Sequence, residues 1–177
     1  MKKLLIALFV VVVMSFSTVL MVNVKAIATE VGDLAPNIVL NDVQTSGDII
    51  KQSILTREQG KKYLLLEFMS INCGPCVGNL PNLQKLNHDS SINALTTIRM
   101  ISIDRNQRLV MDFLNKYRSQ IDYVLSLDLT REALKAYSIN ATPTTFIVDE
   151  NNKVIYKHLG SYDDEIMNEI KRVIIND

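Results

Sequence analysis

The pattern of apolar and polar positions along the chain predicts most of its elements. An apolar stretch at 63–69 predicts a buried strand, and leucines at helical spacing predict a helix over 76–87. Gly78 and Pro81 lie inside that helix, so we expect it to be weakened or kinked. The same reasoning predicts further strands at 38–40, 49–50, 97–103, 123–125, 144–149 and 153–157, and further helices at 108–117, 130–137 and 163–175.

The order of these elements predicts the fold class. Strands and helices alternate through the middle of the chain, and the last part has the order strand, strand, helix. This order is typical of an α/β fold in which helices cover both faces of one sheet. The length of 177 residues suits one such domain with an appendage.

The appendage is a long apolar run at the start of the chain. Two lysines are followed by the run Leu4–Val22, which contains no charged residue. A basic end followed by such a run is the pattern of an exported protein. The segment is either a signal peptide cleaved after Ala26 or an N-terminal membrane anchor, and its length favours the anchor because it is about enough to cross a bilayer. We therefore expect residues 1–26 to be signal peptide or anchor, and residues 27–177 to form a domain outside the cytoplasm.

The charge of the chain gives no support for a nucleic-acid partner. The 19 basic residues equal the 19 acidic residues in number. Three of the basic residues and none of the acidic ones lie in residues 1–26, which leaves 16 basic against 19 acidic residues in the domain. We expect no nucleic-acid binding from a slightly acidic domain without a basic patch.

The strongest chemical signal is Cys73-Gly74-Pro75-Cys76, which contains the only two cysteines of the chain. The motif lies between the predicted strand 63–69 and the helix that follows it, which is where redox-active cysteine pairs occur. The free N–H groups and partial positive charge of a helix N-terminus stabilise a thiolate on the first cysteine. The second cysteine can then attack a mixed disulfide and release the partner.

Two other roles for the cysteines are less favourable. A structural bridge between them would close so short a loop that it would restrict the unfolded chain very little. A structural zinc site needs four ligands, and the two histidines, His88 and His158, are far from the motif in sequence. We therefore expect a redox-active disulfide between Cys73 and Cys76, with no metal and no other cofactor.

With these motifs the sequence resembles the thioredoxin-like proteins, in particular the exported TlpA/ResA-type thiol–disulfide oxidoreductases of the AhpC/TSA–redoxin superfamily. The resemblance covers roughly residues 30–175. It implies a mixed β-sheet flanked by helices, with an N-terminal strand extension. The motifs that carry the resemblance are Cys73-Gly74-Pro75-Cys76, Ala141-Thr142-Pro143-Thr144 before a strand, Gly32-Asp33-x-Ala35-Pro36 near the start, and the insert at 104–123.

The resemblance implies a role for each residue that matches a family motif. Cys73 matches the exposed nucleophile, and Cys76 matches the resolving cysteine. Glu67 matches a buried carboxylate below the pair. The implied substrate-binding residues are Pro143 as a cis-proline that faces the motif, Thr142 as the residue whose backbone pairs with substrate, and Gly74 and Pro75 between the cysteines.

Glu67 also stands out without the resemblance, because a central strand is normally apolar throughout. A buried carboxyl group without a charged partner has its ionised form disfavoured, which suits proton exchange with the Cys76 thiol. The alternative is that Glu67 points to solvent or pairs with Lys61 or Lys62.

The chain departs from the family in one respect, and two other functions stay open. The family usually has a tryptophan before the first cysteine, and Asn72 stands there in this chain. A thiol peroxidase is suggested by the spacing Ser70-x-x-Cys73, although Leu66 stands where such enzymes have proline and Cys76 is too close for their usual resolving position. A non-catalytic metal or peptide carrier is the other alternative.

The function that the sequence favours is an exported, monomeric enzyme that reduces disulfides in client proteins. The Gly-Pro pair between the cysteines resembles the reducing members of the family. The resemblance suggests clients such as apocytochrome c, although disulfides of spore proteins or secreted peptides are equally open, with electrons supplied by a membrane thiol carrier.

Overall fold

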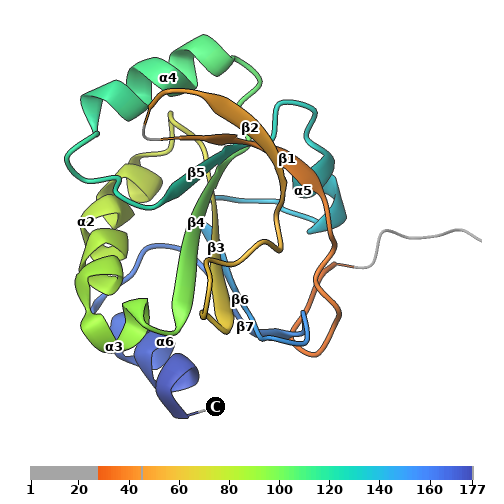
Figure 1. The fold of residues 1–177 in the computed structure, drawn as a ribbon, viewed down its shortest axis with the longest axis vertical. Coiled ribbons are helices and arrows are strands. Elements are labelled where there is room, and N and C mark those ends of the chain that lie inside the picture. The colour runs from red at the N-terminus through yellow and green to blue at the C-terminus, as the bar shows by residue number, and fades with distance from the viewer. Residues whose placement is uncertain (1–27, 45, 177) are drawn as a thin grey trace, which may run out of the picture.

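Residues 28–44 and 46–176 are described by the computed structural model, and they form one mixed β-sheet with helices on both faces (Figure 1). Within these residues seven strands lie in the order β2-β1-β5-β4-β3-β6-β7. Strands β3, β4 and β5 are parallel to one another, and the remaining neighbours pair antiparallel. The strands are β1 (Val39–Val43), β2 (Ile49–Ser53), β3 (Tyr63–Met69), β4 (Thr96–Ser102), β5 (Val124–Leu127), β6 (Thr144–Val148) and β7 (Val154–Leu159).

The helices cover the two faces unequally (Figure 1). Connections of the same hand between consecutive parallel strands lie on the same face of a sheet. Helices α2 and α4 therefore lie side by side, and Leu80 of α2 packs in one cluster with Val110 and Phe113 of α4. α6 covers the same face, and α5 covers the other. The helices are α2 (Gly74–His88), α3 (Ser90–Asn93), α4 (Gln107–Lys116), α5 (Glu132–Ala136) and α6 (Asp164–Asn176).

Strand β3 lies at the centre of the sheet, and all of its side chains are buried. Leu64, Leu66 and Phe68 pack on the α5 face, whereas Leu65 packs with residues of α2 and α6. The prediction of a buried strand at 63–69 is therefore confirmed with the same bounds. A strand with helices on both faces has to be apolar on both faces, which explains the continuous apolar run.

Helix α2 starts two residues earlier than predicted and runs as one helix through Pro81. The proline removes one backbone hydrogen bond, yet Leu80, Leu83 and Leu86 are fully buried against the sheet. Packing of such an apolar face contributes more to a helix in a protein than residue propensity does.

The predicted N-terminal strand extension is present as the β1–β2 hairpin, which joins the sheet where β1 pairs with β5. The predicted signal peptide or anchor at 1–26 lies outside the described residues. Among residues 28–44 and 46–176, no helix has the length and apolar character needed to span a bilayer.

A buried ion pair ties the hairpin to the rest of the sheet. Arg99 on β4 donates from Nη1 to both carboxylate oxygens of Asp42 on β1, at 2.6 Å each, and to Ser126 Oγ on the intervening β5 at 2.8 Å. The side chains of Arg99 and Asp42 are only 2% and 1% exposed. Removing one partner would leave the other charge buried without compensation, which is far more costly than loss of an exposed pair.

Asp42→Asn is therefore expected to lower the free energy of unfolding by about 3–5 kcal/mol, measured by urea denaturation. The matched control is Glu30→Gln, which removes the exposed pair with Lys157 and should cost less than about 1 kcal/mol. Equal losses in the two variants would show that the buried pair does not hold the hairpin to the sheet.

Candidate active site

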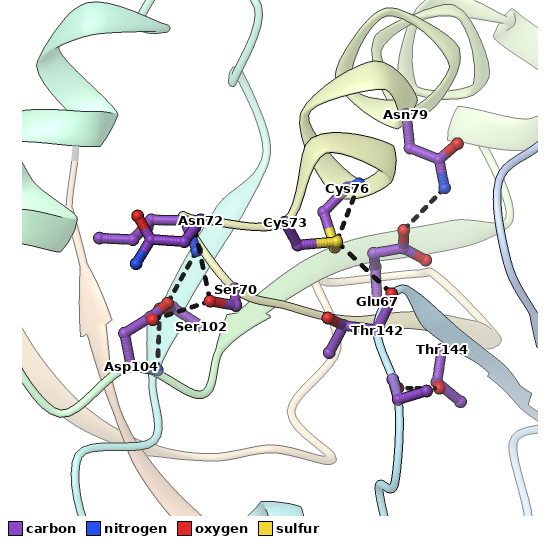
Figure 2. Close-up of a disulfide and its surroundings, with 12 residues drawn as sticks. Glu67, Ser70, Asn72, Cys73, Cys76, Asn79, Ser102, Asp104, Thr142 and Thr144 are labelled. Atoms are coloured by element: carbon purple, nitrogen blue, oxygen red, sulfur yellow. Dashed lines mark hydrogen bonds between the residues drawn. A yellow bond between two sulfur atoms is a disulfide. The ribbon is translucent and has the colours of Figure 1, made fainter.

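The cysteine motif lies where β3 ends and α2 begins (Figure 2). Cys73 is the N-cap residue of α2, with extended backbone at φ −91° and ψ 106°, and Pro75 lies in the first turn, where its missing N–H costs nothing. The Cys76 N–H donates to Cys73 Sγ at 3.2 Å. In the reduced protein this donor and the helix dipole stabilise a thiolate on Cys73.

The two cysteines form a disulfide and differ in accessibility. Cys73 is half-buried, whereas Cys76 is only 2% exposed. Gly74 and Pro75 between them are both exposed. A second protein can therefore approach the motif at Cys73, while Cys76 is buried in a cluster with residues of β3, α2 and α4.

The predicted proline loop faces the motif. The Thr142–Pro143 peptide bond is cis, as expected, and Thr142 O lies 3.4 Å from Cys73 Sγ. Thr142 is half-buried and Pro143 is buried. The loop is held in place by Gly160, whose N–H donates to Pro143 O at 3.0 Å. The fold thus brings together two segments that lie 69 residues apart in the sequence.

Glu67 is buried below the motif, on the face of β3 that α2 covers (Figure 2). Its Oε1 accepts a hydrogen bond from Asn79 Nδ2 at 3.1 Å, and its Oε2 accepts from Thr145 Oγ1 at 2.6 Å and from Tyr162 Oη at 2.8 Å. Burial raises the pKa of Glu67, and the three donors only partly oppose this rise. The alternative that Glu67 points to solvent or pairs with Lys61 or Lys62 is wrong, because Glu67 is only 1% exposed and its carboxyl group is bonded to these three neutral side chains. Lys61 pairs with Glu58 instead, at 2.8 Å.

The three donors to Glu67 were not predicted from the sequence. Asn79 had a weak signal, since it lies three residues after Cys76 on the apolar face of α2. Thr145 belongs to β6, in which every residue is buried, and Tyr162 lies in the connection between β7 and α6. No local sequence pattern relates Thr145 or Tyr162 to the cysteines. Thr145 lies next to Glu67 because the two residues are partners in the pairing of β6 with β3.

A second acid, Asp104, anchors the loop before Cys73. It accepts hydrogen bonds from Ser70 Oγ, from the Ile71 N–H and from Ser102 Oγ, each at 2.9 Å. The hydroxyl of Ser70 is therefore engaged by a carboxylate. A peroxidase would need that hydroxyl to hold a peroxide, so this contact does not favour the peroxidase alternative.

The histidines lie apart from the cysteines. His88 contacts Asp122 on the surface, and His158 is half-buried on β7. In the part of the chain that the structure describes, no group of three or more His, Cys, Asp or Glu side chains could hold a metal ion.

The comparison with known families agrees with this geometry. A family model described as Redoxin matches residues 30–174. The chain belongs to the Redoxin family. Together with the relatives and structures described next, this match confirms the expected TlpA/ResA-type thioredoxin-like protein.

Several curated relatives are named as oxidoreductases. The thiol-disulfide oxidoreductase ResA of Halalkalibacterium halodurans is 24% identical over 143 residues, which cover 81% of this chain and 76% of the relative. The sporulation thiol-disulfide oxidoreductase A of Bacillus subtilis is 28% identical over 111 residues, which cover 62% of this chain and 66% of the relative.

The solved structures confirm the thioredoxin-like fold. StoA from Bacillus subtilis superposes with a TM-score of 0.60 at 22% identity, covering 78% of this chain and 98% of that chain. A putative thiol:disulfide interchange protein DsbE from Chlorobium tepidum superposes with a TM-score of 0.65 at 21% identity, covering 84% of this chain and 98% of that chain.

The raised pKa of Glu67 makes stability depend on pH. In the unfolded chain Glu67 ionises near its ordinary value of 4.5, whereas in the folded protein burial delays ionisation to higher pH. Between these two pKa values the folded protein binds more protons than the unfolded chain, so the free energy of unfolding falls as the pH rises. The wild type should therefore lose stability relative to Glu67→Gln above pH 4.5, measured by urea unfolding of the oxidised protein across pH.

The matched control is Glu165→Gln, which changes an exposed carboxylate in the first turn of α6. Its stability should follow that of the wild type at every pH. Parallel curves for wild type and Glu67→Gln would contradict the assignment of a raised pKa to Glu67.

Proposed function

We propose that this protein reduces disulfides in exported client proteins by exchange with its Cys73–Cys76 pair. The chain is a thiol–disulfide oxidoreductase of the TlpA/ResA type, in keeping with its relatives and its Cys-x-x-Cys pair. One observation carries the proposal. An accessible cysteine at a helix N-terminus is bonded to a buried partner and faces a cis-proline loop.

The exchange follows from the different positions of the two sulfur atoms. The Cys73 thiolate attacks a client disulfide, one client sulfur leaves as a thiolate, and a mixed disulfide forms. Cys76 then transfers its thiol proton to Glu67 and attacks Cys73 Sγ, which releases the second client thiolate and leaves the Cys73–Cys76 disulfide. Two electrons pass to the client, and the structure corresponds to the oxidised product.

The client would bind along the loop of Thr142 and Pro143. Thr142 O lies beside Cys73 Sγ, so an extended client segment that pairs with the Thr142 backbone would bring its disulfide to the nucleophile. Gly74 and Pro75 are exposed next to Cys73 and would form the other side of this surface. Neither has a bulky side chain, which leaves room for a folded or partly folded protein.

The location and the electron supply follow from the export pattern. Residues 1–26 would anchor the domain outside the cytoplasm, or would be removed as a signal peptide. Thiols there are oxidised unless a donor reduces them, so we propose a membrane thiol carrier that returns the pair to the dithiol state. The clients would include apocytochrome c or proteins of the spore, and the enzyme would act as a monomer without nucleic acid, metal or other cofactor.

Cys76→Ser should trap the client, because the mixed disulfide at Cys73 then lacks the thiol that resolves it. After reaction of the reduced variant with a disulfide-containing protein substrate, mass spectrometry should show a stable adduct on Cys73. Cys73→Ser is the matched control and should form almost none, because Cys76 is buried. Equal adducts on both variants would exclude the proposed order of attack.

The reduction potential of the pair tests the direction of the reaction. Equilibration with dithiothreitol or glutathione buffers should give a value near that of thioredoxin, about −270 mV. A value near that of the oxidant DsbA, about −120 mV, would mean that the protein donates disulfides, and the reductase assignment would have to be dropped.

A further inference from the structure

Three oxygen atoms next to the motif lie within hydrogen-bond distance of one another. Thr145 Oγ1 is 2.6 Å from Glu67 Oε2, Tyr162 Oη is 2.8 Å from the same Oε2, and Thr145 Oγ1 is 2.8 Å from Tyr162 Oη. All three residues are buried, and they come from β3, β6 and the connection between β7 and α6. We refer to Glu67, Thr145 and Tyr162 as the oxygen triad.

The triad is held in place by Asn79 on α2. Its Nδ2 donates to Glu67 Oε1 at 3.1 Å, and its Oδ1 accepts from the Tyr162 N–H at 2.8 Å. The same side chain therefore fixes the second carboxyl oxygen of the acid and the backbone of the tyrosine. Because Asn79 is three residues from Cys76, the triad is positioned by the helix that carries the resolving cysteine.

The number of hydrogens in the triad depends on the protonation of Glu67. Three mutual contacts need three hydrogens, and the hydroxyls of Thr145 and Tyr162 supply only two. When Glu67 is ionised, one of the three contacts brings two oxygen atoms together without a hydrogen between them. When Glu67 carries a proton, its Oε2 donates to one of the two hydroxyls and accepts from the other. Each of the three oxygen atoms then donates once and accepts once, and the hydrogen bonds form a closed ring.

We infer that Tyr162 and Thr145 are positioning residues that orient the carboxyl group of Glu67 to take up the Cys76 proton when the disulfide forms. They would thereby set the pH at which Glu67 can accept the Cys76 proton. The inference rests on the dithiol–disulfide exchange of the proposed function. When the Cys73–Cys76 bond forms, the proton of the Cys76 thiol goes to Glu67 and the ring closes. When a donor thiol reduces the bond, that proton returns to Cys76.

Tyr162 acts in this ring as a hydrogen-bond partner and does not itself lose its proton. Burial, together with the nearby Glu67 carboxyl group, raises the pKa of Tyr162 well above its ordinary value. Its hydroxyl therefore keeps its hydrogen at every pH at which thiols exchange. The titrating member of the triad is Glu67.

Three other titratable groups face the triad. His158 on β7 is the register partner of Thr145, and its ring centroid is 6.1 Å from that of Tyr162. Tyr123 lies just before β5, and its pKa is raised mainly by burial and also by Glu67. Tyr156 on β7 donates to Glu169 Oε2 at 3.1 Å, so its hydroxyl is engaged outside the triad.

Tyr162→Phe should shift the pH dependence of exchange. The ionised carboxylate loses a charge-assisted donor, and this loss is greater than that of the neutral acid, so the pKa of Glu67 rises further. Closure of the Cys73–Cys76 bond by the reduced full-length protein with glutathione disulfide should then become about tenfold slower on the acid side of the profile. The rate at high pH should not change.

The control for this variant is Tyr156→Phe, which removes another tyrosine hydroxyl bonded to a carboxylate and should leave the profile of the wild type. Thr145→Val should behave like Tyr162→Phe, whereas Thr145→Ser keeps the hydroxyl and should restore the wild-type profile. Circular dichroism verifies that each variant is folded. A rate lowered by the same factor at every pH, or unchanged by Tyr162→Phe, would overturn the inference.

An infrared measurement tests the neutral acid directly. The oxidised wild type near pH 7 should show the carbonyl band of a protonated carboxyl group, since exposed carboxylates are ionised there. The band should disappear in Glu67→Gln and change frequency in Tyr162→Phe but not in Tyr156→Phe. Absence of the band in the wild type would overturn the inference.

These outcomes are separate from those for the proposed function, because the glutathione reaction and the infrared spectrum require no client protein. A protein that fails to reduce protein disulfides but shows the shifted profile would contradict only the proposed function.

Discussion

The burial of β3 at the centre of the sheet is the constraint on which the rest of this structure depends. Helices cover both of its faces, so the strand has to be apolar, and a short turn after its end leads into α2, which covers one of these faces. Cys73 lies at that junction, with its sulfur at the free N–H groups of α2. The same packing that stabilises the domain therefore places the nucleophile where a thiolate is favoured.

Glu67 is the one acidic residue of β3, and a carboxyl group is unfavourable in a strand that is buried on both faces. Burial of a carboxyl group without a cation disfavours its ionised form, and the fold supplies three neutral donors instead of a charge. Neutral donors leave the acid able to change its protonation state, whereas a buried arginine or lysine would hold it ionised. The contrast within the same sheet is Asp42, which has Arg99 as its partner and serves to hold the hairpin.

Most of the fold could be predicted because its signals are local. The run at 63–69, the leucines of α2 and the short strands around them each have a pattern that a single element explains. The predicted first and last residues of the helices and strands were less accurate than the predicted elements themselves. α2 begins at Gly74 because Cys73 takes the cap position, and α5 begins at Glu132 because the Asp128 carboxylate accepts the N–H groups of Ala133 and Leu134. Such ends depend on particular side-chain contacts that periodicity does not contain.

The sequence by itself determined the cysteine pair, its position between strand and helix, and the presence of an acid inside an apolar strand. These features depend on neighbours in the chain, so local rules of packing and helix termini are enough to recognise them. That the loop of Thr142 and Pro143 faces Cys73 was expected from the family resemblance alone, and the tertiary structure places Thr142 O beside Cys73 Sγ. Only the tertiary structure decided that Asn79, Thr145 and Tyr162 surround Glu67. These contacts join β3, β6, α2 and the segment before α6. The order of the strands in the sheet and the packing of the helices bring these segments together, and no local sequence pattern contains that information.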